Sequence, residues 1–308
     1  MNITSARVHC SSANIGSGFD SFGICHDAFH VDGTITINDP HKPFEAVFNG
    51  NSKNIDDIEN SAVAVVRKMA LDMEIKGKFT ISFDSSIPVG MGLGSSGAAS
   101  VCSAILLNRL FDLKLSEKEI ITYASHGENF AAGSYHLDNV AASTLGNFSA
   151  VFSDSPLRIR NYPISGGIKF LAIVPNITAR NKTMENRKLI PEAVPFSSTV
   201  NNVKFSTSLI AGILTGDRDL VEYGLNDNIV EVARTSRYPF FPEVRSICQR
   251  NKALGLILSG SGPAMLCFTD EKTDVKQIQK ELDAYFKRNG LDFITSISYP
   301  TTGAYERN

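Results

Sequence analysis

The stretch Gly90 to Ser100, GMGLGSSGAAS, places four glycines and three serines in eleven consecutive positions. Glycine loses more backbone freedom on folding than any other residue, so such a cluster weakens a fold unless the backbone needs unusual dihedral angles or approaches a ligand closely. Clusters of glycine and serine between periodic segments also form plain surface loops. The sequence on either side decides between the two interpretations.

The flanking residues indicate a strand, a glycine loop and a helix, in that order. Upstream, Phe79, Ile81 and Phe83 alternate with polar residues, as in a half-buried strand, and Pro88 follows them. Downstream, Ser96 is a favourable N-cap, and apolar residues recur at helical spacing: Ala98, Val101, Cys102, Ile105, Leu106 and Leu110. Because the first turn of a helix offers unpaired N–H groups, the segment predicts a phosphate-binding loop.

This loop differs from the two commonest phosphate-binding patterns. No Gly-Lys-Ser/Thr sequence ends it, and no lysine lies between Lys78 and Lys114. The glycine spacing matches G-x-G-x-x-G only loosely, and the acidic residue expected about 20 positions later is not clear, which disfavours a dinucleotide fold. A bound phosphate would therefore be neutralised by backbone amides, the helix dipole and Mg²⁺.

The composition is that of an ordinary globular protein. The 308 residues are 43% hydrophobic and 20% charged, enough for one large or two medium domains. The net charge of -2 and the lack of basic runs argue against nucleic acid or an anionic membrane as partner. Five scattered cysteines, the lack of a signal pattern and short apolar runs predict a cytoplasmic protein with reduced thiols and no membrane insertion.

The order of predicted elements indicates an α+β fold rather than a strict βαβ alternation. The pattern favours strands at 3–10, 34–38, 44–48, 148–152, 167–175, 255–268 and 292–298, and helices at 56–75, 201–214, 217–224, 242–251 and 273–288. A break near 150–165 predicts two domains, residues 1–160 and residues 161–308. His26 and His30 lie in extended chain with a turn at Val31-Asp-Gly. Two histidines four positions apart bind zinc together only on a helix, so no zinc site is predicted here.

Three further clusters carry polar groups beside small residues. Residues 11–23, SSANIGSGFDSFG, read either as an Asx-rich turn or as a strand end that presents Asn14 and Asp20 to a ligand. Residues 127–141, GENFAAGSYHLDNVA, are either a solvated helix end or a site, and carry Glu128, His136, Asp138 and Asn139. The turn SGSGP, set in the apolar segment 253–268, is either a tight hairpin turn or a second glycine turn that belongs to the site.

The order of these motifs resembles the GHMP kinase superfamily. Its second motif, P-x-x-x-G-L-G-S-S-A-A, is similar to the segment Pro88 to Ala98, with small departures at Met91 and Gly97. Its third motif, S-G-[AS]-G-P, matches Ser259 to Pro263. Within the superfamily, the segments 11–23 and GSYHLDN resemble the corresponding motifs of homoserine kinases, although His9 stands where that family usually has proline.

The resemblance implies a two-lobed GHMP kinase fold with the glycine-rich phosphate loop at a helix N-terminus. It makes residues 1–160 the N-terminal ATP-binding domain and residues 161–308 the C-terminal GHMP kinase domain. It implies that ATP is bound by the residues Pro88, Gly90, Gly92, Leu93, Gly94, Ser95, Ser96, Gly97 and Ala98. The loop would be braced by the residues Ser259, Gly260, Ser261 and Gly262. It further implies that Mg²⁺ is held by Ser96 and Glu128.

A site for homoserine must recognise three groups of this zwitterion: the ammonium, the carboxylate and the hydroxyl. Asp20 is suited to the ammonium group, and Arg187 and Arg234 are similar to the two arginines that hold the carboxylate in that family. By resemblance the pocket is completed by Asn14, His136 and Asn139. Asn14 and Asn139 would hold the reacting hydroxyl, and Asp138 is expected to act structurally or electrostatically rather than as a base.

The expected activity is therefore phosphorylation of L-homoserine by ATP in threonine biosynthesis. The resemblance also implies that the protein is a homodimer. Another GHMP kinase activity, of shikimate or mevalonate-pathway type, stays open. A catalytically silent sensor that binds ATP and a metabolite stays open as well. Turnover with a panel of acceptors distinguishes all three.

Overall fold

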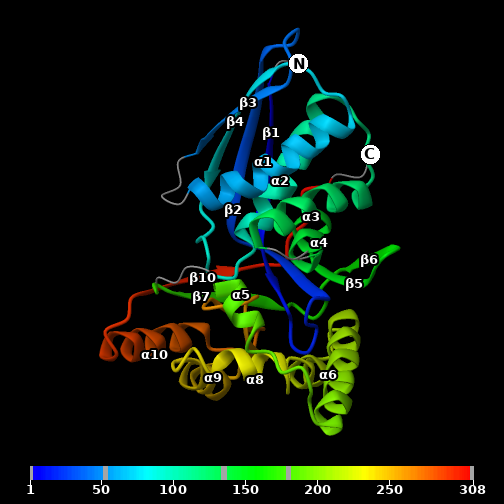
Figure 1. Ribbon diagram of the computed structural model, residues 1–308. Helices are drawn as coiled ribbons and strands as arrows, with labels where there is room; N and C mark the ends of the chain where they lie inside the picture. The colour runs from blue at the N-terminus through cyan, green and yellow to red at the C-terminus, as the bar shows by residue number, and fades with distance from the viewer. Residues whose placement is uncertain (1–2, 51–54, 133–136, 178–181, 306–308) are drawn as a thin grey trace.

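Two β-sheets divide the strands between the two halves of the chain (Figure 1). The computed structural model describes residues 3–50, 55–132, 137–177 and 182–305. The first sheet, in the order β3-β4-β2-β5-β6 with β1 paired to β2, contains β1 (Ile3–Ala13), β2 (Phe22–Asp39), β3 (Glu45–Gly50), β4 (Lys78–Ser85), β5 (Phe148–Asp154) and β6 (Leu157–Tyr162). The second, in the order β10-β7-β9-β8, contains β7 (Lys169–Pro175), β8 (Gly255–Leu258), β9 (Met265–Thr269) and β10 (Phe293–Ser298).

Helices pack on each sheet separately (Figure 1). The helices beside the first sheet are α1 (Ile55–Asp72), α2 (Ser95–Leu110), α3 (Glu117–Ala132) and α4 (Leu137–Leu145). The helices of the second half are α5 (Lys182–Arg187), α6 (Phe196–Thr215), α7 (Arg218–Gly224), α8 (Val230–Thr235), α9 (Phe241–Arg250) and α10 (Val275–Arg288). None of the helices in the described part of the chain has the length and apolar character needed to cross a membrane.

An apolar core joins the two sheets. Phe22 of β2 packs edge-on against Phe148 of β5, with ring centroids 5.1 Å apart, and Phe170 of β7 does the same with Phe268 of β9 at 5.0 Å. All four rings belong to one buried cluster that also includes residues of α6. Burying such rings removes a large apolar area from water. The N-terminal end of β2, which begins at Phe22, is therefore fixed against the second sheet. This places the segment between β1 and β2 between the two halves.

The strand β2 is longer than the sequence indicated. It runs without interruption through Val31-Asp-Gly, where we expected a turn, and pairs with β1 on one side and β4 on the other. A Cβ on Gly33 would lie 2.4 Å from the Sγ of Cys102 in α2. The glycine thus marks a close approach of a helix to the sheet rather than a turn, and the prediction of a turn was wrong.

The remaining predictions of secondary structure are largely confirmed. The segment 255–268 is a hairpin of two strands, β8 and β9, and β6 lies inside the stretch that we interpreted as a break. The helices α5 and α8 were not predicted because each has only six residues. All five cysteines are buried and free. The division at residue 160 stays a prediction.

Candidate active site

The predicted phosphate loop connects β4 to the N-terminus of α2. Gly90, Gly92 and Gly94 adopt positive φ angles of 71°, 85° and 65°, a region that glycine enters without strain. The N-cap is Gly94, and no side chain caps the helix. The predicted capping role of Ser96 is therefore wrong, because the left-handed Gly94 starts the helix at Ser95 and places Ser96 in its first turn.

Three carbonyl groups in the middle of the loop are turned toward the surrounding scaffold. Three successive carbonyl oxygens accept hydrogen bonds: Met91 O from Ala264 N at 3.0 Å, Gly92 O from Ser259 Oγ at 2.7 Å, and Leu93 O from Ser11 N at 3.2 Å. In a planar trans peptide the following N–H points opposite to the carbonyl. The N–H groups of Gly92, Leu93 and Gly94 therefore point away from the scaffold, which is the arrangement an anion needs.

Close packing against neighbouring segments explains two of the glycines. A Cβ on Gly92 would lie 2.2 Å from the carbonyl oxygen of Ser259. A Cβ on Gly94 would lie 2.3 Å from Ser11 Oγ and 2.8 Å from Asn139 Oδ1. No side chain fits at either position. The contact at Gly92 is the one that a bracing role for the turn at 259–262 requires.

Two polar side chains face the first turn of α2. A Cβ on Gly97 would lie 3.4 Å from the Cβ of Asn139 in α4 and 3.8 Å from Oε1 of Glu128 in α3, whose side chain is 3% exposed. Asn139 Oδ1 also accepts a hydrogen bond from Ser11 Oγ at 2.9 Å. The predicted metal ligands Ser96 and Glu128 thus lie beside the predicted phosphate site, whereas His136 lies outside the described residues.

The predicted acceptor residues gather around the segment between β1 and β2. Asp20 donates its N–H to Asn14 Oδ1 at 2.9 Å, and its carboxylate accepts from Arg187 Nη2 at 2.7 Å. The guanidinium groups of Arg187 and Arg234 lie 5.6 and 5.0 Å from the centre of the Phe19 ring. Positions 20, 187 and 234, far apart in the sequence, form one charged cluster with a shared aromatic contact.

Arg234 is the most buried cation of this cluster. It is 4% exposed and donates from Nη1 to the carbonyl oxygen of Gly260 at 3.0 Å. Its Nε is buried and has no hydrogen-bond partner within the described ranges. Burial lowers the pKa of Arg234, but a guanidinium group stays charged at neutral pH. A buried cation with an unused donor is suited to an anionic ligand group.

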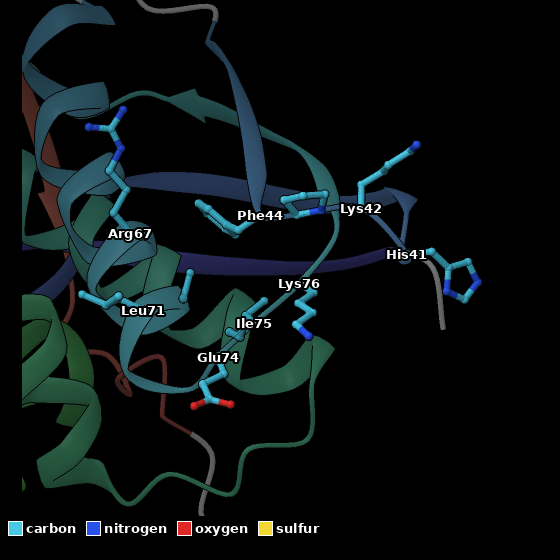
Figure 2. Close-up of a pocket in the computed structure, with 10 residues that line it drawn as sticks. His41, Lys42, Phe44, Arg67, Leu71, Glu74, Ile75 and Lys76 are labelled. Carbon is cyan, nitrogen blue, oxygen red and sulfur yellow. The ribbon is translucent and has the colours of Figure 1, made fainter.

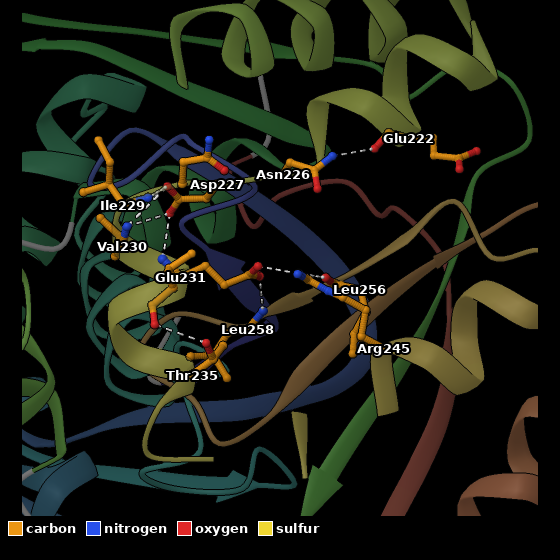
Figure 3. Close-up of polar contacts among 12 residues, drawn as sticks. Glu222, Asn226, Asp227, Ile229, Val230, Glu231, Thr235, Arg245, Leu256 and Leu258 are labelled. Atoms are coloured by element: carbon orange, nitrogen blue, oxygen red, sulfur yellow. Dashed lines mark hydrogen bonds and ion pairs between the residues drawn. The ribbon is translucent and has the colours of Figure 1, made fainter. Parts of the chain in front are cut away.

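The short helix α8 that carries Arg234 is fixed by two buried carboxylates (Figure 3). Asp227 accepts hydrogen bonds from the backbone N–H groups of Ile229 at 2.8 Å, Val230 at 3.1 Å and Glu231 at 2.8 Å. Glu231 in turn accepts from Arg245 and from Leu258 N of β8. Burial raises the pKa of Glu231 to about 7. The helix is thereby tied to the second sheet, so the direction of Arg234 is set by its surroundings.

Asp138 lies at the start of α4 and is 1% exposed. Burial is the largest cause that raises the pKa of this carboxyl group to about 7, and the neighbouring charge of Asp20 adds to it. Its Oδ1 accepts the N–H of Asn139 at 2.8 Å, whereas Oδ2 has no hydrogen-bond partner among the residues described. With a pKa near neutral pH, both the protonated and the ionised form of this carboxyl group are populated there.

The sequence did not single out the side chains that support these residues. Asn186 of α5 is fully buried and donates from Nδ2 to Ser261 O at 2.6 Å and to Tyr238 Oη at 3.0 Å. It holds α5 against the turn at 259–262 and so positions its neighbour Arg187. Phe19 and Ser11 lie inside the quoted motif 11–23, which is the signal that could have identified them.

A separate pocket of about 840 Å³ lies near the C-terminal end of α1 (Figure 2). Its walls include Phe44, Ala70 and Ile75, with Lys42 and Arg67 among the polar residues around them. None of the predicted site residues lines it. The candidate active site is thus defined by its side chains and backbone groups and not by this hollow.

Comparisons with known proteins agree with this geometry. Residues 60–147 match the N-terminal domain of the GHMP kinases, and residues 209–288 match the GHMP kinase C-terminal domain. The homoserine kinase of Saccharolobus solfataricus is 36% identical over 282 residues, 91% of each chain, and that of Sulfurisphaera tokodaii is 34% identical over 302 residues, 97% of each chain.

The solved structures that are similar to this protein include a homoserine kinase from Cytophaga hutchinsonii, with a TM-score of 0.90 and 25% identity, covering 99% of this chain and 96% of that one. The mevalonate kinase of L. major, at 16% identity and a TM-score of 0.71, covers 98% of each chain and shares the fold. The predicted two-lobed α+β architecture is confirmed. From its sequence and its fold alike, the chain belongs to the GHMP kinase family.

Proposed function

We propose that this protein transfers the γ-phosphoryl group of ATP to the hydroxyl group of L-homoserine and so produces O-phospho-L-homoserine for threonine biosynthesis. The observation that carries the proposal is the cluster of Asp20, Arg187 and Arg234 beside the glycine loop. Relatives called homoserine kinase, 34 and 36% identical over most of the chain, support it.

The cluster has the charges that a zwitterionic amino acid requires. Asp20 and Arg187 form an ion pair with both side chains more than one third exposed, so the pair is accessible to a ligand. An α-amino acid carries an ammonium and a carboxylate a few bonds apart and can replace each partner in that pair. Arg234, which is buried, adds a second cation for the carboxylate. Mevalonate and shikimate have no ammonium group to match Asp20.

ATP would lie with its phosphates on the N–H groups of the glycine loop, at the N-terminus of α2. The oxygens of Ser96 and Glu128 fit a hard divalent cation, because carboxylate and hydroxyl oxygens are the ligands that Mg²⁺ prefers and Glu128 is a buried carboxylate facing this turn. Bound Mg²⁺ would neutralise phosphate charge that this lysine-free loop leaves uncompensated.

Asn14 and Asn139 would position the reacting hydroxyl. The amide of Asn139, on α4, lies beside Gly94 of the loop, and the amide of Asn14 bonds to the backbone of Asp20 on the acceptor side. Phosphoryl transfer depends mainly on positioning and on stabilising charge, so it does not require a strong base. In this assignment Asp138 has a structural or electrostatic role next to Asp20 and Arg234, and does not act as the base.

The test is coupled ADP release from the purified protein with Mg·ATP and one acceptor at a time. We expect turnover with L-homoserine and none above background with mevalonate, shikimate, galactose or no acceptor. Two analogues sharpen the result. L-2-Aminobutyrate lacks the hydroxyl and should inhibit without turnover, and 4-hydroxybutyrate lacks the ammonium and should react far more slowly.

Other outcomes would redirect the assignment. Preferred turnover of mevalonate or shikimate would retain the ATP site but exclude the roles given to Asp20 and Arg187. ATP binding without turnover of any acceptor would favour a catalytically silent sensor. The proposed domains, 1–160 and 161–308, the homodimer and the cytoplasmic location are further parts of the proposal, and light scattering of the purified protein tests the dimer.

A further inference from the structure

A fully buried imidazole lies between the two sheets and has no part in the activity described above. His26 is on β2, is 0% exposed, and has its ring 5.9 Å from the ring of Phe170 in β7. Burial lowers the pKa of His26 to about 3, so the ring is neutral. A neutral imidazole has one donor and one acceptor nitrogen, and both need partners when buried.

The ring belongs to a continuous row of hydrogen bonds that ends at the glycine loop. The successive contacts are Ser298 Oγ to His26 Nδ1 at 3.3 Å, His26 Nε2 to Ser12 Oγ at 3.1 Å, Ser12 Oγ to Ser259 Oγ at 2.8 Å, and Ser259 Oγ to the carbonyl oxygen of Gly92 at 2.7 Å. We call these residues the His26 row. It crosses from β10 of the second sheet to the phosphate loop.

The positions of the protons follow from the last contact. A carbonyl oxygen only accepts, so the single hydroxyl proton of Ser259 belongs to Gly92 O. Ser12 must then supply the proton between the two hydroxyl groups, and His26 Nε2 must be the donor to Ser12. The Cys10 thiol donates to the backbone carbonyl of His26 at 3.2 Å, which leaves Nδ1 to accept from Ser298. Every donor in the row is used once.

We infer that His26 is a positioning residue for the nucleotide, acting through Ser12 and Ser259 to hold the Gly92 carbonyl and thereby orient the N–H of Leu93. The peptide between Gly92 and Leu93 is one rigid plane, so holding its carbonyl fixes the direction of its N–H. The inference rests on the proposed function only in that ATP is the ligand of the loop. His26 itself does not touch the nucleotide.

The test measures binding of a fluorescent Mg·ATP analogue together with the midpoint of thermal unfolding, Tm. Ser12→Ala interrupts the row and keeps the ring, and we expect the Kd for the nucleotide to rise about tenfold. His26→Leu should do the same. His26→Gln keeps one donor and one acceptor and should restore the Kd to within about threefold of the unsubstituted protein.

The control is Ser149→Ala, which removes an equally buried hydroxyl, on β5, that bonds to Gly146 O at 3.3 Å and is not part of the row. It should lower Tm and leave the Kd unchanged. If Ser12→Ala and His26→Leu lower Tm but leave the Kd within twofold, the row only stabilises the fold and the inference is wrong. Should His26→Leu not fold, Ser12→Ala decides alone. Because binding is measured without an acceptor, failure of the homoserine assignment leaves this test intact.

Discussion

The two sides of the candidate active site are made of different parts of the polypeptide. The phosphate side, residues 90–97, presents backbone N–H groups and has no lysine. The acceptor side presents charged side chains, Asp20, Arg187 and Arg234, that come from three separate segments. A backbone site is sensitive to any added side-chain atom, whereas a charged site is sensitive to the loss of a charge or of its geometry.

The largest effect is expected on the phosphate side, from Gly92→Ala. The new Cβ would lie 2.2 Å from Ser259 O at a positive φ, so the loop must move away from its brace. We expect the KM for ATP to rise at least about 100-fold, as misplaced groups at a reacting centre cost about that factor. Steady-state kinetics with ATP as the varied substrate measures this.

Gly290→Ala is the matched control for that substitution. Gly290 has a φ of 64° and nothing within 4 Å of the added Cβ. It should cost about 1 to 2 kcal/mol of stability through backbone strain and leave the KM for ATP unchanged. If Gly92→Ala and Gly290→Ala changed the KM for ATP equally, the glycine loop would have no special role in binding ATP.

On the acceptor side we expect a smaller and more selective effect from Arg187→Lys. The lysine keeps the charge but replaces a planar fork by a single ammonium group, which should raise the KM for homoserine about tenfold and leave that for ATP within twofold. Arg7→Lys is the control, because Arg7 makes a two-contact ion pair with Asp32 on the strands β1 and β2, outside the acceptor side. It should leave the KM for homoserine unchanged. An unchanged KM for homoserine in Arg187→Lys would exclude Arg187 from the site.

The smallest effect on turnover is expected from Asp138→Asn, which lies between the two sides. If the carboxyl group acts electrostatically, kcat should stay within about tenfold of the unsubstituted protein. Abolished turnover in a variant that still folds and binds both substrates would instead identify Asp138 as the base.

The same substitution should change the pH dependence of stability. Burial raises the pKa of folded Asp138 to about 7, while an unfolded aspartate titrates near pH 4. Between about pH 4 and 7 the unfolded state loses a proton that the folded state keeps, so the stability of the protein falls as pH rises through this window. Asp138→Asn removes this fall in stability, because asparagine does not titrate. We expect its Tm to exceed that of the unsubstituted protein at pH 8, and the difference to vanish at pH 4.

Local sequence patterns predicted the phosphate side better than the acceptor side. The glycine loop lies next to its strand and helix in the chain, so alternation and helical spacing were sufficient to find it. The error at Ser96 came from a glycine N-cap in the left-handed conformation, which composition does not reveal. Gly33 was misread because a close approach and a turn both favour glycine.

The acceptor side depends on contacts between distant segments. Asp20 and Arg187 are 167 positions apart, and no periodicity relates them. Arg187 was identified only through the resemblance to a family, whereas Asp20 was also marked by its place at a strand end. The burial of Asn186 and His26 was missed, since a polar residue in the sequence carries no sign that it will be buried and paired.

The turn at Ser259 and Gly260 touches both sides at once. Ser259 bonds to the glycine loop, and the carbonyl of Gly260 accepts from Arg234. Any shift of this turn when one substrate binds changes the free energy with which the other binds, and such coupling is reciprocal. The affinity for ATP should therefore depend on whether homoserine is present, and by the same factor as the affinity for homoserine depends on ATP.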